Sequence, residues 1–397
     1  PRRGSHSFAN MATVRVKPQF LSPAKTFFKI CLLAAVLIYI FNKVFGGGDD
    51  VPSVGSSVDE KIQNFQWSAV PNGDGKAPAG SNTKVKSSGL SESELSRLWN
   101  FTEKQKSNAV YVMIPFANAK SNPSLQAKFH ACVSSMSDLS SAQIVLFVLG
   151  DRESYKIAEK TVEAGTRKNI QLHFVDVEAL GEEMKELINT MQQHFSYKPG
   201  SYFSHTLFFL STAIHRLAPP TISRLIMLDA DLKFEADIKQ LHDLFDRFSD
   251  TSVMGLAHES QPVYRHILSL YRQSHPGTRA GGPPPDGLPG FNSGVLLMDL
   301  DKMRRSQRYN SLLDSDVVKE LAEKYSYKGH LGDQDFYSLV SLDNEDLFYV
   351  LPCTWNRQLC QWWRDKGYED VFDNYFACDG KINIYHGNCN TPLPKDA

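Results

Sequence analysis

The sequence carries almost no net charge and lacks any cluster of lysine and arginine interleaved with aromatic residues. Its 43 basic and 44 acidic residues leave a formal charge of -1 at pH 7. A protein that binds nucleic acid needs a basic patch to neutralise phosphates, so the composition excludes that class of partner. With 42% apolar residues, the 397-residue chain can bury one large α/β core with appendages.

Cys-x-x-Cys pairs are also absent, which disfavours a zinc site. Cys31 and Cys132 stand alone, and the other four cysteines cluster late in the sequence: Cys353, Cys360, Cys378 and Cys389. In an oxidising compartment, four clustered cysteines indicate two disulfides, for which three pairings exist. We predict Cys353 with Cys378 and Cys360 with Cys389.

An apolar run near the N-terminus, residues 30–41, is short for a membrane span of about 20 residues. Lys29 and Lys43 can extend from its ends to the bilayer surface and restore the length. Basic residues precede the run, and no Ala-x-Ala-like cleavage site follows it, which disfavours the alternative of a cleaved signal peptide. We predict a type II signal anchor at residues 27–45, with residues 1–26 as a cytosolic tail and the rest luminal.

Residues 46–89 are rich in glycine, serine, proline, asparagine and aspartate, and have too few large apolar side chains to fold. They predict a largely disordered luminal stem over residues 46–106, with a glycosylation acceptor at Asn100. Residues 107–397 are predicted to form the luminal folded domain, whose C-terminal segment is rich in disulfides.

Strand and helix patterns alternate from residue 108 onward. Strands are predicted at residues 110–116, 142–149 and 170–177, and helices at 124–136, 152–164 and 180–195. This order indicates an α/β fold with a largely parallel sheet covered on both faces. Later elements are expected at 204–215 (helix), 238–248 (helix) and 295–300 (strand). Ligands of such sheets bind at the C-terminal strand ends, at a topological switch point.

Within residues 224–234, an apolar run ends in two carboxylates one residue apart, Asp229 and Asp231, and predicts a buried strand that presents both acids at its C-terminal edge. In an extended chain, side chains at i and i+2 point the same way, so this pair can bind one hard divalent cation. Taken alone, the pair is more typical of a strand that runs into an acidic turn.

Three later segments change that estimate: Phe291–Leu300 with Asn292-Ser293-Gly294, Leu331–Asp335 with Asp333-Gln334-Asp335, and Ile384–Asn388 with His386-Gly387. With the Asp-x-Asp pair, their order and spacing resemble glycosyltransferase family 8, retaining enzymes of the nucleotide-sugar-dependent GT-A fold. The resemblance covers about residues 110–392. It implies a mostly parallel mixed sheet flanked by helices.

The resemblance implies that Asp229, Asp231 and His386 hold Mn²⁺ or Mg²⁺, which neutralises the diphosphate of a UDP-sugar. It places the uracil and ribose against Met113, Ile114, Pro115 and Phe116, with the backbone of Ala230 on the ribose. It places the sugar against Asn292, Ser293 and Gly294. The alternatives are a plain core strand for the first group and a strand-entry turn for the last.

The family's closing lysine, which contacts the diphosphate, is missing here. Asn388 is the predicted substitute. The resemblance places Gln334 beside the transferred sugar, where an amide is a poor nucleophile, so a front-face mechanism is favoured over double displacement. Asp333 is predicted to bind sugar hydroxyls, and Asp335 is either such a ligand or an acid at a helix N-terminus.

Trp362 and Trp363 lie in an aromatic patch beside the cysteines and are candidates to receive the acceptor. Core packing is an equal alternative, and one tryptophan among these two and Trp355 is expected to be buried.

The nearest likeness within the family is to enzymes that transfer xylose from UDP-xylose, in α-1,3 linkage, to a xylose-glucose glycan O-linked on EGF repeats. This implies a single-pass protein of the endoplasmic reticulum membrane, with the Golgi as alternative. Transfer from UDP-glucose or UDP-galactose, a catalytically silent lectin-like module and a metal phosphoesterase remain alternatives.

Overall fold

The structure, a computed structural model, describes residues 89–103, 106, 108–165, 169–196 and 205–394. The predicted cytosolic tail, the predicted transmembrane helix and most of the predicted stem lie outside these residues. Within the described part, no helix is both long and apolar enough to cross a bilayer.

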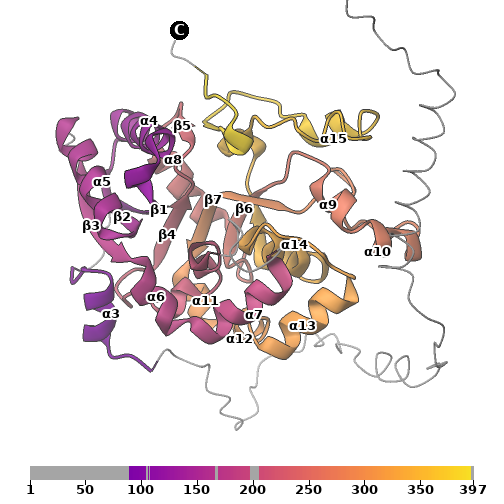
Figure 1. Ribbon diagram of the computed structural model, residues 1–397, viewed down its shortest axis with the longest axis horizontal. Coiled ribbons are helices and arrows are strands. Elements are labelled where there is room, and N and C mark those ends of the chain that lie inside the picture. The colour runs from indigo at the N-terminus through magenta and orange to yellow at the C-terminus, as the bar shows by residue number, and fades with distance from the viewer. Residues whose placement is uncertain (1–88, 104–105, 107, 166–168, 197–204, 395–397) are drawn as a thin grey trace, which may run out of the picture. The chain divides into compact units, whose positions relative to one another are not determined.

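A seven-stranded sheet with the order β3-β2-β1-β4-β7-β6-β8 forms the centre of the folded part (Figure 1). Its strands are β1 Ala109–Pro115, β2 Gln143–Gly150, β3 Ile170–Asp176, β4 Arg224–Leu228, β6 Met254–His258, β7 Phe291–Asp299 and β8 Phe348–Val350. Strand β7 runs antiparallel to β4 and β6, and all other neighbours are parallel. The predicted mostly parallel, mixed sheet is confirmed.

Both faces of this sheet are buried, which explains why its strands are apolar throughout rather than alternating. Along β1, Tyr111 and Met113 enter one core, whereas Val112 and Ile114 enter the other. One core is covered by α4 Pro123–Leu139, α5 Arg152–Ala164 and α8 Ile238–His242. The other is covered by α6 Val177–Glu183, α7 Lys185–Phe195, α11 Leu300–Arg305, α12 Gln307–Ser311, α13 Ser315–Lys324 and α14 Asp333–Asp343.

The folded part begins upstream of the predicted boundary at residue 107. Helix α3, Glu92–Leu98, starts at a capping box in which Ser91 and Glu94 satisfy each other's backbone N–H groups. Trp99 and Phe101, which follow the helix, are fully buried in the core with α6 and α7. Residues that were assigned to the stem therefore belong to the folded unit.

Several predicted elements differ in the structure. The helix predicted at 180–195 is two helices, α6 and α7, which meet at Met184. The described part of the helix predicted at 204–215 is made of 3-10 turns, Thr206–Phe208 and Leu210–Arg216. The backbone of Ala213, with φ -134°, leaves the helical region, so a continuous α-helix does not form there.

Other elements also differ from their predicted boundaries. Strand β7 begins at Phe291 rather than 295, because Phe291 and Asn292 pair with β6 across a bulge. The helix predicted at 238–248 is α8, which continues as a 3-10 turn, Asp243–Arg247. The strand predicted to end at the two carboxylates is β4, which ends at Leu228; a turn then holds Ala230 and Asp231, and β5 follows.

A second, three-stranded sheet joins the end of the chain to its middle. It has the order β5-β10-β9, with β5 Leu232–Phe234, β10 Ile384–His386 and β9 Arg357–Gln358. Two disulfides secure this region, Cys353–Cys378 and Cys360–Cys389, which is the pairing that the sequence analysis favoured.

Candidate active site

Three strands end or begin at one edge of the large sheet. The strand order runs from β1 through β2 to β3 on one side and continues with β4 on the other side of β1, so the C-terminal ends of the parallel strands β1 and β4 form the topological switch point. Because β7 is antiparallel to β4, its first residues reach the same edge, where the Asp229 N–H donates to the Gly294 carbonyl over 2.9 Å. The predicted nucleotide, metal and sugar segments therefore meet there.

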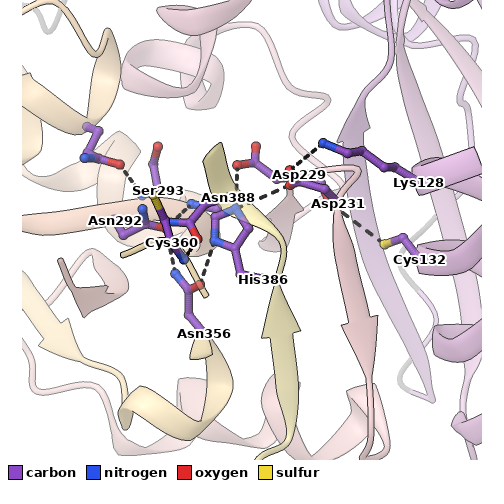
Figure 2. Close-up of polar contacts among 12 residues, drawn as sticks. Lys128, Cys132, Asp229, Asp231, Asn292, Ser293, Asn356, Cys360, His386 and Asn388 are labelled. Atoms are coloured by element: carbon purple, nitrogen blue, oxygen red, sulfur yellow. Dashed lines mark hydrogen bonds and ion pairs between the residues drawn. The ribbon is translucent and has the colours of Figure 1, made fainter. Parts of the chain in front are cut away.

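Asp229, Asp231 and His386 come together at this edge (Figure 2), with candidate ligand atoms all within 4.8 Å of one another. The His386 Nε2 atom lies 3.5 Å from Asp229 Oδ2 and 3.3 Å from Asp231 Oδ1. The pairing of β10 with β5 sets His386 opposite Leu232, directly after Asp231. The turn between β4 and β5, rather than a continuous strand, thus presents the two carboxylates.

Gly294 makes room for the His386 ring. A Cβ atom at position 294 would fall onto the imidazole, 2.7 Å from Nδ1 and 3.0 Å from Nε2. Any side chain here would displace the ring, so the predicted close approach at Gly294 serves the histidine.

The charges of the three side chains suit a cation. Burial acts to raise the pKa of Asp231, but hydrogen bonding and the charge of His386, together with Lys128, outweigh it and hold this pKa at about 2. Burial lowers the pKa of His386, but Asp229 and Asp231 outweigh it and raise it to about 9. The proton on the His386 imidazole therefore occupies the place of a divalent metal ion. Such an ion accepts both carboxylate and imidazole ligands.

Lys128 from α4 is a cation that the sequence analysis missed. Its Nζ lies 3.3 Å from Asp231 Oδ2 and 2.9 Å from Asn390 Oδ1 in the closing segment (Figure 2). A single lysine in an amphipathic helix carries no spacing signal that could have identified it. Asn388, the predicted substitute for the missing family lysine, uses its Oδ1 to accept the N–H groups of Leu359 and Cys360. Of the polar atoms of this side chain, the amide nitrogen is left to contact a phosphate.

Asp333 and Gln334 begin helix α14 beside the first residues of β7. The Asp333 carboxylate accepts the hydroxyls of Ser211 and Ser293, the latter over 3.1 Å, and burial raises its pKa to about 7. The Gln334 Oε1 atom accepts the Ser293 N–H over 3.3 Å. Both predicted residues are thus held against the predicted sugar segment.

Asp335 faces the other way. It is completely buried and accepts the Leu331 N–H over 2.7 Å and the Tyr264 hydroxyl over 3.0 Å. Burial raises its pKa to about 6. Of the two roles left open for Asp335, the structure supports that of an acid fixing the start of the helix.

Glu259 and Asn356 also belong to this edge and were missed, because each is an isolated residue far from the motifs. Glu259, buried between β6 and α9 Val263–Ile267, accepts the amides of Asn292 and Gln334. Asn356, fully buried before β9, contacts Nδ1 of His386 over 2.9 Å.

The predicted nucleotide-binding residues differ in how far their side chains are buried. The side chains of Met113, Ile114 and Phe116 are buried in the two cores, and Ala230 is buried as well. These four side chains are therefore not available to contact a nucleotide, whereas Pro115 is partly exposed and the backbone at the end of β1 remains a candidate.

The aromatic patch has one buried and one open tryptophan. Trp355 is buried, as expected of one of the three, whereas Trp362 is 57% exposed. Trp363 packs against His266 with ring centroids 4.7 Å apart. Its backbone N–H donates to the Gln261 side chain, near Glu259. Trp362 stands edge-to-face on Trp363, with Lys366 over its ring.

A switch-point edge that gathers a carboxylate pair, an imidazole and a glutamine points to a glycosyltransferase of the nucleotide-sugar type. The family model described as glycosyl transferase family 8 matches residues 128–376, and the chain belongs to this family.

Characterised relatives agree with this membership. The chain is 44% identical over 296 residues to xyloside xylosyltransferase 1 of Homo sapiens, covering 72% of this chain and 75% of the relative, and the same values hold for that of Mus musculus. The crystal structure of the mouse enzyme in its apo form superposes with a TM-score of 0.70 over 72% of this chain and 100% of that one. The predicted GT-A fold is confirmed.

Proposed function

We propose that this protein transfers xylose from UDP-xylose to a xylose-glucose glycan O-linked on EGF repeats, forming an α-1,3 bond with retention. The observation that carries the proposal is the meeting of Asp229, Asp231 and His386 beside Gln334, in a chain 44% identical to enzymes named xyloside xylosyltransferase. The class of reaction follows from the site, and the sugar from the relatives.

In this proposal Asp229, Asp231 and His386 hold Mn²⁺, or Mg²⁺ in its place. When bound, the ion supplies Lewis-acid stabilisation of the negative charge that develops on the departing diphosphate. Lys128, 3.3 Å from Asp231, supplies the positive charge that the family's closing lysine provides elsewhere, and the Asn388 amide nitrogen adds a donor. The backbone from Met113 to Phe116 and at Ala230 receives the nucleoside, and Asn292, Ser293 and Gly294 receive the sugar.

With retention as the outcome, the residue beside the sugar favours a front-face step over double displacement. Gln334 is a neutral amide and cannot form a stable glycosyl-enzyme bond, so a carboxylate nucleophile is not available from this position. The bond from the anomeric carbon to UDP breaks while a bond to the acceptor hydroxyl oxygen forms on the same face. The hydroxyl proton passes to the departing diphosphate oxygen, and Gln334 stabilises the positive charge on the sugar. Asp333 binds sugar hydroxyls.

Trp362 and Trp363 form the acceptor platform in this proposal. An exposed tryptophan beside a sugar site offers the flat apolar face on which a glycan ring stacks. Trp363 anchors that platform, because it packs on His266 and donates to Gln261.

We further propose that the folded domain is luminal in the endoplasmic reticulum, held by the anchor at residues 27–45 through the stem that follows it. The two disulfides support an oxidising compartment, since cytosolic proteins seldom keep such bridges.

Mass spectrometry of an EGF-repeat peptide carrying xylose-glucose, after reaction with the full chain and a panel of UDP-sugars, tests the proposal. We expect addition of one pentose from UDP-xylose alone, abolished by EDTA. Addition of a hexose from UDP-glucose or UDP-galactose would establish the alternative donor. Absence of transfer and of UDP-sugar hydrolysis with every donor would establish a silent lectin-like module.

A further inference from the structure

A chain of buried hydrogen bonds leads from the metal-binding histidine to the sugar-facing glutamine. His386 Nδ1 contacts Asn356 Oδ1 over 2.9 Å, and Asn356 Nδ2 donates to Asn292 Oδ1 over 2.9 Å. Asn292 Nδ2 donates to Glu259 Oε2 over 3.2 Å, and the same oxygen accepts Gln334 Nε2 over 3.4 Å. Each of these five side chains is at most 8% exposed.

The direction of every link is determined. Asn292 Oδ1 accepts the Gly294 N–H over 3.1 Å, and Gln334 Oε1 accepts the Ser293 N–H over 3.3 Å, so both amides turn their nitrogens to Glu259. A carboxylate oxygen at that point accepts both.

These hydrogen-bond directions also determine which ring nitrogen of His386 carries a hydrogen. Because Asn356 donates to Asn292, its oxygen must face His386, and Nδ1 of the imidazole must carry a hydrogen. When a metal ion displaces the proton from Nε2, the lone pair of that nitrogen is then directed to the place between Asp229 and Asp231 where a metal ligand is required.

We infer that Glu259 is a positioning residue that ends this relay, fixing the His386 tautomer for metal binding and the Gln334 amide for the sugar at the same time. The inference rests on the proposed function for the role of Gln334, but its metal-binding half stands on the site geometry.

The backbone around Glu259 is built to hold it in place. Its own N–H donates to the Gly290 carbonyl over 3.0 Å, and the next N–H, of Ser260, donates to Gln358 Oε1 over 3.0 Å. Gln358 lies in β9, opposite His386 in β10. The segment with Glu259 is therefore linked to the strand with His386 through the Gln358 side chain as well as through the relay.

The test compares two side chains of similar size in the full chain. Glu259→Gln keeps an oxygen that can accept both amides, whereas Glu259→Met keeps the length and removes the acceptor. We expect the methionine variant to bind Mn²⁺, followed by electron paramagnetic resonance of the free ion, about 10–100-fold more weakly, the range for lost outer-sphere partners. The glutamine variant is expected to bind close to wild type.

At saturating Mn²⁺ the methionine variant should still show a lower kcat with little change in the KM for UDP-sugar, because Gln334 has lost its partner. Asp335→Asn is the matched control, since Asp335 is an equally buried acid that has no contact with the relay. Its Mn²⁺ affinity should stay at the wild-type value.

Wild-type Mn²⁺ affinity in a folded methionine variant, or equal weakening in the glutamine and methionine variants, would overturn the inference. If the methionine variant does not fold, Glu259→Asp takes its place: it keeps the charge but withdraws the carboxylate by one methylene from both amides. Unchanged Mn²⁺ affinity of that variant would equally overturn the relay. Absence of transfer by the wild-type chain refutes the proposed function and leaves the metal-binding comparison intact.

Discussion

The chain contains two Asp-x-Asp sequences at the same edge of the sheet, and they do opposite things. Asp229 and Asp231 stand on a turn between two strands, and both approach His386. Asp333 and Asp335 stand in the first turn of α14, where residues two apart point about 200° away from each other. One faces the sugar segment, and the other faces Tyr264.

The pKa values of the two aspartate pairs also differ. The pKa of Asp231 is held at about 2 by His386 and Lys128 against the effect of burial. Burial raises the pKa of Asp333 to about 7 and that of Asp335 to about 6, because only neutral donors accompany them. Identical spacing thus yields a cation site on a turn and two separate buried acids on a helix, and the backbone makes the difference.

The largest effect is expected from Asp231→Asn. Loss of one carboxylate ligand removes most of the metal's contribution, which at about 4 kcal/mol corresponds to about 1,000-fold in the rate of sugar transfer. Circular dichroism should be that of wild type, because asparagine matches the size and shape of this side chain. Transfer that persists in this variant, or in EDTA, would show that the first pair is not a metal site.

Gly294→Ala tests the same pair through its third member. The added methyl group displaces the His386 ring, and we expect Mn²⁺ affinity to fall by about 10–100-fold, as for other losses of ligand orientation. Isothermal titration with Mn²⁺ measures this. An unchanged affinity would mean that His386 does not bind the ion.

Asp335→Asn examines the second pair. The amide can satisfy only one of the two donors, so we expect a loss of about 1–3 kcal/mol in the free energy of unfolding, the cost of an unsatisfied buried group. Urea unfolding in EDTA provides the value. A loss of Mn²⁺ affinity in this variant would erase the distinction between the pairs.

The raised pKa of Asp335 predicts that the free energy of unfolding depends on pH. The folded protein holds a proton on Asp335 up to a pKa of about 6, against 3.8 for an ordinary aspartate, so it binds more protons than the unfolded chain between these values. The free energy of unfolding must therefore fall as pH rises through this window. Wild type minus Asp335→Asn should show that slope between pH 4 and about 6, and a flat difference would contradict a buried acid at this position.

The smallest effect is expected from Lys128→Met. Partly exposed ion pairs contribute less than about 1 kcal/mol, so the KM for UDP-sugar should rise at most about fivefold. Mn²⁺ affinity should hold or increase, because the lysine no longer competes for Asp231. Lys128→Arg should restore the KM. A fall in Mn²⁺ affinity would instead assign Lys128 to holding Asp231 in place.

The sequence was sufficient for features that repeat or stand in motifs. Strand periodicity predicted β1, β2 and β3, and the four family segments predicted that Asp229 and Asp231 would meet His386. The clustering of four cysteines predicted two disulfides.

Features that depend on a single distant partner were not predictable. In the 3-10 turns before β4, the Thr212 carbonyl accepts the hydroxyl of Tyr309, a residue far away in the sequence. Glu259, Asn356 and Lys128 occur singly, and only the folded chain brings them to the site. The role of Asp335 was undecided for the same reason, since Tyr264 is far from it in sequence.

The position of His386 in the chain has a consequence for biosynthesis. A ribosome delivers the whole large sheet and both aspartates before it delivers β10, and the segment around His386 is secured by the bridge from Cys360 to Cys389. If His386 completes the metal site as proposed, a nascent chain lacks that site until translation has passed this segment and the bridge has closed. Competence for chemistry is then the last property that the protein acquires.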